Sequence, residues 1–401
     1  MDLARSAIDI RPALEQDLDR LIDIHTSAFP SPRGRYAHAA KFTHNPLGEL
    51  SDLHVLVEGG ALLAHGFLFP LEVWIGARRV PVGGIASVGV APEARGRGLA
   101  SRLLDHLHQV ALARGDAATV LYPFRHGFYA RHGYARASSY RRLRFHPAAV
   151  PWGCTHAARV ASGPDRPSLV ACRDAAASAR TGLLARSERA WDTRLAREHT
   201  SWFVVAGANG VEGYVAWTLE QAEAHAETTL VVQEMAARTV EAERSLWGLI
   251  GAQRDQVATV RADVAADDPI DLALVDADRG VFGDSRVEHP IGQLVGGPMV
   301  RVLDPARALT GRGWPTEGTL RLGVGAATFV LTARDGAATV APSTGEPDVR
   351  LDPPALAAVA LGGLRPSAAA RLGWLVARDD RALSLADALL RLPPYFSPDP
   401  F

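Results

Sequence analysis

The stretch SVGVAPEARGRGLASRLL, residues 87–104, constrains this chain more than any other part of it. An apolar, strand-like run ends before Pro92, an arginine- and glycine-rich turn follows, and leucines then recur at helical spacing. Glycines at 96 and 98 let successive backbone N–H groups point in one direction. The first N–H groups of the helix lack internal partners and lie at the positive end of its dipole. The turn therefore predicts a binding site for an anion such as a pyrophosphate.

Three classes of nucleotide-binding turn compete for this motif. A P-loop needs the sequence GK[ST], which is absent. A dinucleotide-binding turn needs G-x-G-x-x-G early in a βαβ unit, whereas Ser101 occupies its sixth position and the preceding strands look antiparallel. Arg95, Gly98 and Ala100 match R-x-x-G-x-A, the spacing of the acyl-CoA loop in GNAT acetyltransferases, and the strand order agrees. The alternative without a ligand is a solvated arginine turn that caps a helix.

The bulk properties narrow the function classes. With 401 residues the chain is long enough for two or three domains. A formal net charge of −1 gives no reason to expect nucleic acid or an acidic membrane surface as a partner. Cys154 and Cys172 form no CxxC pair and have no histidines at metal-ligand spacing, so we expect neither a disulfide scaffold nor a metal. The first residues lack the apolar core of a signal peptide and no run approaches a membrane span, which predicts a cytoplasmic protein.

Composition and pattern divide the chain into three units. Residues 1–150 alternate strands with helices around the arginine-glycine turn. Residues 151–291 begin where proline, alanine, glycine and serine become frequent, and they repeat the order of strand then helix with nothing like RGRG between them. Residues 292–401 hold a strand meander followed by alanine-rich helices. We expect an α+β protein whose second unit repeats the first fold without its anion site.

The motifs also carry a family resemblance. GVAPEARGRGLASRLL, followed by FYARHGYARA, resembles the GNAT domain of the enhanced intracellular survival (Eis) family of N-acetyltransferases. GGPMVRVLDPARAL and LDPPALAAVALGG are similar to the sterol-carrier-like domain of that family. The resemblance implies an α+β fold with a GNAT domain at 1–150, a degenerate GNAT domain at 151–291 and a sterol-carrier-like domain at 292–401. It also implies acetyl-CoA as cosubstrate and a homo-oligomer, in this family a hexamer.

The same resemblance assigns residues to acetyl-CoA. Three strand residues would run beside the pantetheine arm, and a backbone N–H near Val88 would polarise the thioester carbonyl. The turn would hold the pyrophosphate, and two residues after the next strand would line the other side. The set is Val88, Gly89, Val90, Arg95, Gly96, Arg97, Gly98, Leu99, Ala100, Ser101, Phe124 and Arg125.

Two catalytic residues follow from the resemblance. Tyr129 would be the general acid that protonates the departing CoA thiolate, and the terminal carboxylate of Phe401 would be the general base. A primary amine with a pKa of about 10.4 arrives protonated, and a fixed anion can bind it and accept its proton. The alternatives are that Tyr129 only packs under the cofactor groove and that the tail is frayed. Aromatic residues and prolines in PPYFSPDPF indicate a docked tail instead.

The acceptor amine is less constrained. Phe29, Ser31, Trp74 and Asp399 are candidate lining residues for a small-molecule amine. The resemblance implies an aminoglycoside or another polyamine. Serine flanked by arginines at FPSPRGR, and proline before Phe401, make the expected pocket less acidic, which would suit a smaller polyamine or a lysine side chain. Two other classes stay open, a non-catalytic acyl-CoA-binding regulator and a binder of apolar ligands through the third domain.

Overall fold

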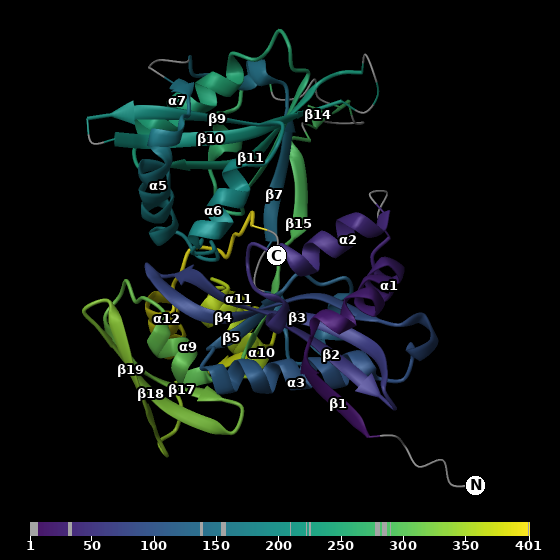
Figure 1. Cartoon of the computed structure of the whole chain (residues 1–401). Helices are drawn as coiled ribbons and strands as arrows, with labels where there is room; N and C mark the ends of the chain where they lie inside the picture. Colours follow the sequence, from purple (N-terminus) through teal and green to yellow (C-terminus); the bar gives the residue numbers. More distant parts are fainter. Residues whose placement is uncertain are drawn as a thin grey trace.

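The computed structural model describes residues 7–30, 34–136, 139–153, 158–208, 210–221, 223, 226–276, 281–282, 287–288, 290–399 and 401. Figure 1 shows the second domain above the first and third domains, with the C-terminal tail running between the two levels. No helix within these described ranges is long and apolar enough to cross a membrane.

The first domain is a seven-stranded sheet with the order β1-β2-β3-β4-β5-β16-β6. Its strands are β1 (Ile8–Pro12), β2 (Leu53–Glu58), β3 (Ala61–Ile75), β4 (Arg78–Val90), β5 (Ala118–Leu121), β6 (Ala135–Arg136) and β16 (Met299–Val302). Its helices are η1 (Glu15–Asp17), α1 (Leu18–Ala28), α2 (Gly34–Thr43), η2 (Leu50–Asp52), η3 (Pro92–Ala94), α3 (Leu99–Arg114) and α4 (His126–Ala130). Strands β4 and β5 are parallel and pair only over 82–84 and 118–120, so the sheet opens between them beyond Gly84.

The second domain repeats this plan, with the sheet order β15-β7-β12-β11-β10-β9-β8. Its strands are β7 (Ser139–Phe145), β8 (Ala158–Val160), β9 (Thr200–Gly207), β10 (Gly210–Glu220), β11 (Thr229–Ala237), β12 (Thr259–Ala265) and β15 (Gly292–Gly296). Its helices are η4 (Pro147–Ala149), η5 (Gly163–Asp165), α5 (Arg166–Ser178), α6 (Glu188–Leu195), α7 (Val240–Gly251) and α8 (Ile270–Ala273). A small hairpin joins β13 (Val281–Phe282) to β14 (Val287–Glu288).

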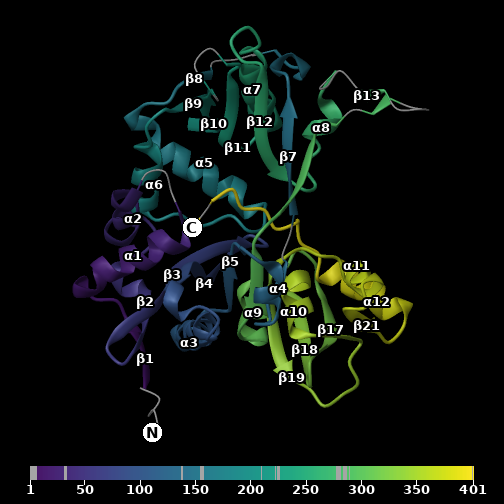
Figure 2. The ribbon, with the colours of Figure 1, turned by 90° about the vertical axis from the view of Figure 1, so that its right-hand side faces the viewer.

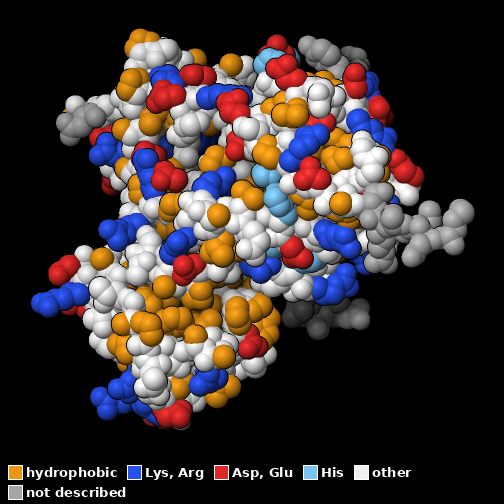
Figure 3. Space-filling view, turned by 60° about the horizontal axis from the view of Figure 1, so that its bottom comes forward, with side chains coloured by type: hydrophobic (Ala, Val, Ile, Leu, Met, Phe, Trp, Pro, Cys, Tyr) orange, Lys and Arg blue, Asp and Glu red, His pale blue; other side chains and the backbone are white. Residues whose placement is uncertain are grey.

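The third domain is a five-stranded sheet with the order β19-β18-β17-β20-β21. Its strands are β17 (Gly318–Val324), β18 (Ala327–Arg334), β19 (Ala337–Pro342), β20 (Val349–Leu351) and β21 (Leu375–Ala377). Its helices are α9 (Pro305–Gly311), α10 (Pro353–Leu356), η6 (Ala357–Leu361), α11 (Pro366–Arg371) and α12 (Asp380–Leu389). One continuous core joins this domain to the first, because leucines of β17 and β18 pack into the same cluster as those of β3. Hydrophobic side chains also gather in the lower left of Figure 3, where the third domain lies.

The first two domains exchange strands across the predicted boundaries at 150 and 291. Strand β7 precedes residue 150, yet it pairs with β12 and β15 in the second sheet. Strand β16 follows residue 291, yet it lies between β5 and β6 in the first sheet. Figure 2 shows β7 rising from the lower part of the molecule into the upper sheet. Each sheet is therefore completed by a strand from outside its own run of sequence, and a local sequence pattern does not predict such a pairing.

The expected α+β class is confirmed.

The exchange makes the first domain depend on a distant strand. Val300 on β16 is 3% exposed and pairs with Val120 and Ala135. We expect Val300→Asp to lower the free energy of unfolding by about 3–5 kcal/mol, because it buries an uncompensated carboxylate. Denaturant unfolding followed by circular dichroism measures the change. The control is Leu294→Asp on β15, where the side chain is 73% exposed, with an expected effect within about 0.5 kcal/mol. Equal effects of the two substitutions would contradict the exchange.

Candidate active site

The arginine-glycine turn forms an open backbone cradle at the start of α3. Gly96 and Gly98 have φ values of +79° and +77°, and a Cβ atom at either position would meet nothing within 4 Å. No side chain caps the helix, whose first internal bond runs from the Arg102 N–H to the Gly98 carbonyl at 3.2 Å. The preceding N–H groups of the first turn lack helical partners, and that turn contains no acidic residue. The cradle fits a pyrophosphate.

The arginines of the turn are held by the protein. Arg95 donates to the Val90 carbonyl and to the Ser27 carbonyl at the end of α1, each at 3.3 Å. Arg97 forms an ion pair with Glu58 at 2.5 Å. Ser101 lies 3.0 Å from His132 Nε2. The arginines therefore fasten the turn to β4, α1 and β2, and the anion-binding groups are mainly backbone N–H groups.

A bulge interrupts the ladder between β3 and β4 next to this turn. His65 pairs with Gly89 and Phe67 with Ala86, so two residues of β4 lie opposite one residue of β3. Ser87 at the bulge has a φ of +52°. A bulge removes backbone groups from regular pairing, which leaves them free to bind a ligand. Val88 and Val90 are half-buried, and Gly89 is buried against His65, where a Cβ atom would come within 2.7 Å of Nε2.

Tyr129 lies on α4 within a group of aromatic rings. It is 4% exposed, and its ring centroid is 5.0 Å from that of Phe128, 5.7 Å from Phe124 and 5.8 Å from Tyr134. Burial raises the pKa of Tyr129 to about 12. The hydroxyl therefore keeps its proton at neutral pH. Phe124, which is 69% exposed, and the exposed Arg125 lie on the turn between β5 and α4, beside the opening of the sheet.

Tyr134 has a different environment, in which its hydroxyl is held by buried partners. Its hydroxyl lies 2.9 Å from His108 Nε2 and 2.8 Å from Thr119 Oγ1, and Arg301 Nη1 donates to His108 Nδ1 at 2.8 Å. A guanidinium can only donate, so Nδ1 accepts and Nε2–H donates to Tyr134, whose hydroxyl is also hydrogen-bonded to Thr119. Arg301 lies on β16, so the exchanged strand orients this buried chain of hydrogen bonds.

The C-terminal tail is docked at the opening between β4 and β5. The hydroxyl of Tyr122, just after β5, donates to the carbonyls of Ser397 at 3.1 Å and Asp399 at 3.3 Å. The ring centroids of Tyr122 and Phe401 are 5.3 Å apart, and a Cβ atom on Gly84 would lie 3.4 Å from the Phe401 ring. The chain end therefore lies where the two parallel strands separate.

Tyr129 and Phe401 pack on opposite faces of the first sheet. A Cβ atom on Gly66 would contact Leu103 and Leu107 of α3, which identifies the α3 face. Tyr129 packs on that face, because its neighbour Tyr134 is hydrogen-bonded to His108 of α3. Odd-numbered residues of β3 point to the other face, where Leu71 and Phe401 lie against Gly84.

The predicted acceptor-lining residues are scattered. Phe29 is 38% exposed at the end of α1, with its ring 4.6 Å from that of His25. Trp74 pairs with Arg79 at the far end of β3 and donates its backbone N–H to the Leu183 carbonyl at 2.9 Å, so it contacts the second domain. Ser31 lies outside the described residues.

Asp399, also predicted to line the acceptor site, lies inside the protein. It is 5% exposed and forms ion pairs with Arg173 at 2.5 Å and with Arg186. Both arginines belong to the second domain. The carboxylate is neutralised inside the protein and does not offer a free negative charge to an amine. The sequence gives no signal for Arg173, Arg186 and Tyr122, because their contacts depend on where the tail lies.

Among the described residues, no group of three or more His, Cys, Asp or Glu side chains is arranged to hold a metal.

Comparison with known proteins agrees with this geometry. The GNAT acetyltransferase domain matches residues 9–137 and again 182–302, and the sterol carrier protein domain matches 306–397. An uncharacterized N-acetyltransferase of Streptomyces avermitilis is 28% identical over 361 residues, covering 83% of this chain and 84% of that protein. The N-acetyltransferase Eis of Mycobacterium tuberculosis is 24% identical over 330 residues, covering 77% and 78%.

Solved structures share the whole fold. A GCN5-related N-acetyltransferase from Anabaena variabilis has a TM-score of 0.84 at 22% identity and covers 98% of this chain and 100% of that one. Eis1 from Mycobacterium abscessus has a TM-score of 0.77 at 23% identity, with coverage of 98% and 100%. Two GNAT domains followed by a sterol carrier domain make this chain a GNAT-type N-acetyltransferase, of a family that uses acetyl-CoA. Eis proteins are among its homologues, so the resemblance found in the sequence is confirmed.

The cradle predicts a specific sensitivity to acetyl-CoA. We expect Gly98→Ala to raise the KM for acetyl-CoA about tenfold, because a left-handed alanine costs roughly 1–2 kcal/mol and distorts the cradle. Steady-state kinetics with acetyl-CoA varied measures the effect. The matched control is Gly115→Ala, at the other end of α3 with a φ of +99°, which carries the same backbone strain. If both variants raise this KM equally, the cradle has no special role in cofactor binding.

Proposed function

We propose that this chain transfers acetyl from acetyl-CoA to a primary amine, with the Phe401 carboxylate as general base and Tyr129 as general acid. The observation that supports this most directly is the docking of Phe401 where β4 and β5 separate, with Tyr129 on the opposite face of the same sheet. An acetyl thioester held between β4 and β5 would then have the base on one side and the acid on the other.

The reaction uses the residues as follows. The Phe401 carboxylate binds the ammonium group and takes one proton, directly or through a water. The free amine attacks the thioester carbonyl, and a backbone N–H at the Ser87–Val88 bulge stabilises the oxyanion. The C–S bond then breaks, and Tyr129 donates its proton to the CoA thiolate. The second proton that the nitrogen loses as the amide forms returns, through water, to the Tyr129 oxygen. Direct attack is favoured over an acyl-enzyme, because Cys172 is fully buried and burial raises the pKa of its thiol to about 11.

The acceptor that we propose is a polyamine or an aminoglycoside, since a molecule with several amines can place one at Phe401 and others at the surface. The exposed ring of Phe29 supplies a face that can contact a cationic group. The neutralisation of Asp399 leaves the terminal carboxylate as the main anion proposed for this site, which also suits a lysine side chain or a small polyamine.

The terminal base is tested by deleting Phe401. We expect amine-dependent thiol release from acetyl-CoA, over a panel of aminoglycosides and polyamines, to fall about 10²–10⁴-fold in the deletion variant. A second variant with one glycine appended after Phe401 keeps every native side chain but displaces the carboxylate, and it should lose activity as well. The KM for acetyl-CoA should stay within about twofold in both, because the cradle is untouched. Unchanged turnover in both variants would exclude the terminal carboxylate as the base. Tight CoA binding without turnover of any amine in the panel would favour the non-catalytic acyl-CoA-binding regulator.

The acid is tested by Tyr129→Phe together with a pH profile. We expect kcat to fall about 10²-fold in the variant. Because the pKa of Tyr129 is raised to about 12, the wild-type rate should rise or stay level from pH 7 to about pH 10 as the amine loses its proton. Tyr134→Phe is the control, and it should lower the unfolding midpoint while the rate per folded molecule is kept. A fall in the wild-type rate near pH 8 would contradict Tyr129 as the acid.

A further inference from the structure

We propose that the second GNAT domain is a receptor for the catalytic tail, in which Arg173, Arg186 and Asp399 are positioning residues for the Phe401 carboxylate. This inference rests on the proposed function, because it assigns the second domain a role in placing the proposed base.

The second domain keeps the architecture of an acyl-CoA cleft. Strands β11 and β12 are parallel and pair only over 229–232 and 259–262, and beyond that point they separate, as β4 and β5 do. Strand β11 also carries a bulge, because Trp217 pairs with Val232 and Ala216 with Glu234, which leaves Gln233 as the extra residue. The opening and the bulge are therefore present in both domains.

The second domain lacks the anion cradle. Helix α7 is capped by Thr239, whose hydroxyl accepts a hydrogen bond from the Ala242 N–H at 3.2 Å. Glu241 and Glu243 lie in its first turn. A capped helix end with two carboxylates repels a pyrophosphate, so a nucleotide cofactor is disfavoured here.

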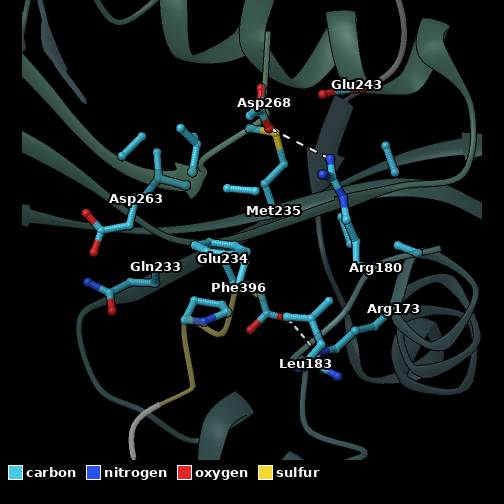
Figure 4. A pocket seen from close by; sticks show the side chains of 18 of the residues that line it. Arg173, Arg180, Leu183, Gln233, Glu234, Met235, Glu243, Asp263, Asp268 and Phe396 are labelled. Carbon is cyan, nitrogen blue, oxygen red and sulfur yellow. Dashed lines mark ion pairs between the residues drawn. The ribbon is translucent and has the colours of Figure 1, made fainter. Parts of the chain in front are cut away.

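The C-terminal tail lies against this cleft instead. A cavity of about 660 Å³ lies between β11 and β12, and Phe396 and Pro398 of the tail form part of its wall. Figure 4 shows Phe396, Glu234 and Arg173 among the side chains that line this cavity. The backbone N–H of Phe396 donates to the Thr181 carbonyl at 2.8 Å, so main-chain pairing joins the tail to the second domain.

Charge explains why the tail is needed. Glu234, next to the bulge, is 6% exposed and forms ion pairs with Arg186 at 2.6 Å, Arg194 at 2.8 Å and Arg173 at 3.4 Å. Three arginines thus surround one resident carboxylate. Asp399 supplies the second carboxylate through Arg173 and Arg186. Without the tail, this buried group would carry two uncompensated positive charges, which is unfavourable at low dielectric.

Electrostatics at Asp399 agree with this pairing. Burial alone would raise the pKa of Asp399, but Arg173 and Arg186 hold that pKa below its ordinary value. The carboxylate is therefore ionised inside the protein, as the ion pairs require.

The ion pairs of Asp399 lie close enough to Phe401 to set its position. Asp399 is two residues from Phe401, so their Cα atoms are at most about 7 Å apart. The second domain holds the Asp399 side chain, and Tyr122 of the first domain binds its carbonyl at 3.3 Å. Fastening Asp399 from two domains leaves the terminal carboxylate little freedom, and general-base catalysis depends on such positioning.

The test compares two substitutions in the full-length chain. Asp399→Asn keeps the shape of the side chain and removes the charge that faces Arg173 and Arg186. Arg194→Gln perturbs the same buried group through Glu234 and forms no ion pair with Asp399 among the described contacts. We expect Asp399→Asn to lower kcat at least tenfold at pH 7 with the KM for acetyl-CoA within twofold. Arg194→Gln should keep kcat within about threefold.

Two further readouts separate positioning from general destabilisation. The loss of kcat in Asp399→Asn, relative to wild type, should become smaller toward pH 10, where the amine needs no base. In a variant that already lacks Phe401, Asp399→Asn should cause no further loss of kcat. Hydrogen exchange at the backbone amides of residues 395, 396, 397 and 399 should speed up in Asp399→Asn and stay near wild type in Arg194→Gln. If Asp399→Asn does not fold, Arg186→Lys keeps the charge with a shorter reach and should show a smaller loss of the same kind.

The outcomes distinguish this inference from the proposed function. Faster hydrogen exchange of the tail in Asp399→Asn with an unchanged kcat would overturn the positioning role. The role would also be overturned if the losses of kcat from Asp399→Asn and from the Phe401 deletion multiplied in the double variant. If the wild type has no amine-dependent turnover, the proposed function fails by itself. Hydrogen exchange of the tail amides then still tests whether the second domain holds the tail. An unchanged hydrogen-exchange rate in Asp399→Asn would overturn that role of the second domain.

Discussion

The ion pairs of Asp399 with Arg173 and Arg186 connect the end of the chain to the second domain, and the proposed position of the base depends on them. They form inside the protein, where an unpaired partner would be costly. Tyr122 binds the same segment from the first domain, and the Tyr395 N–H donates to the Gly362 carbonyl of the third domain at 3.0 Å. All three domains therefore hold the segment that ends at Phe401.

The exchanged strands make the domains one mechanical unit. Strand β16 completes the first sheet, and its Arg301 orients His108 and Tyr134 beneath the ring of Tyr129. Strand β7 completes the second sheet, which contains Glu234. Strand β16 thus contacts the surroundings of Tyr129, and the second sheet contacts the tail through the arginines that Glu234 binds. The shared core of the first and third domains adds rigidity around the same opening.

The two GNAT domains show how one backbone plan serves two kinds of ligand. Both have a bulged strand beside a parallel partner that separates from it. In the first domain, uncapped N–H groups after Gly98 favour a phosphate. In the second, Thr239 caps the helix, Glu241 and Glu243 add negative charge, and buried arginines favour a carboxylate from the tail. Local side-chain chemistry at the helix start decides between the two.

The sequence by itself determined the features whose causes are local. The cradle needs glycines with positive φ at 96 and 98, and the domain motifs lie within short runs, so the α+β class and the GNAT resemblance could be read directly. Only the tertiary structure decided the strand exchange and the partners of Asp399, which lie 226 and 213 residues away in Arg173 and Arg186. Ion pairs and strand pairing act through space, and no periodicity along the chain encodes a partner at that separation.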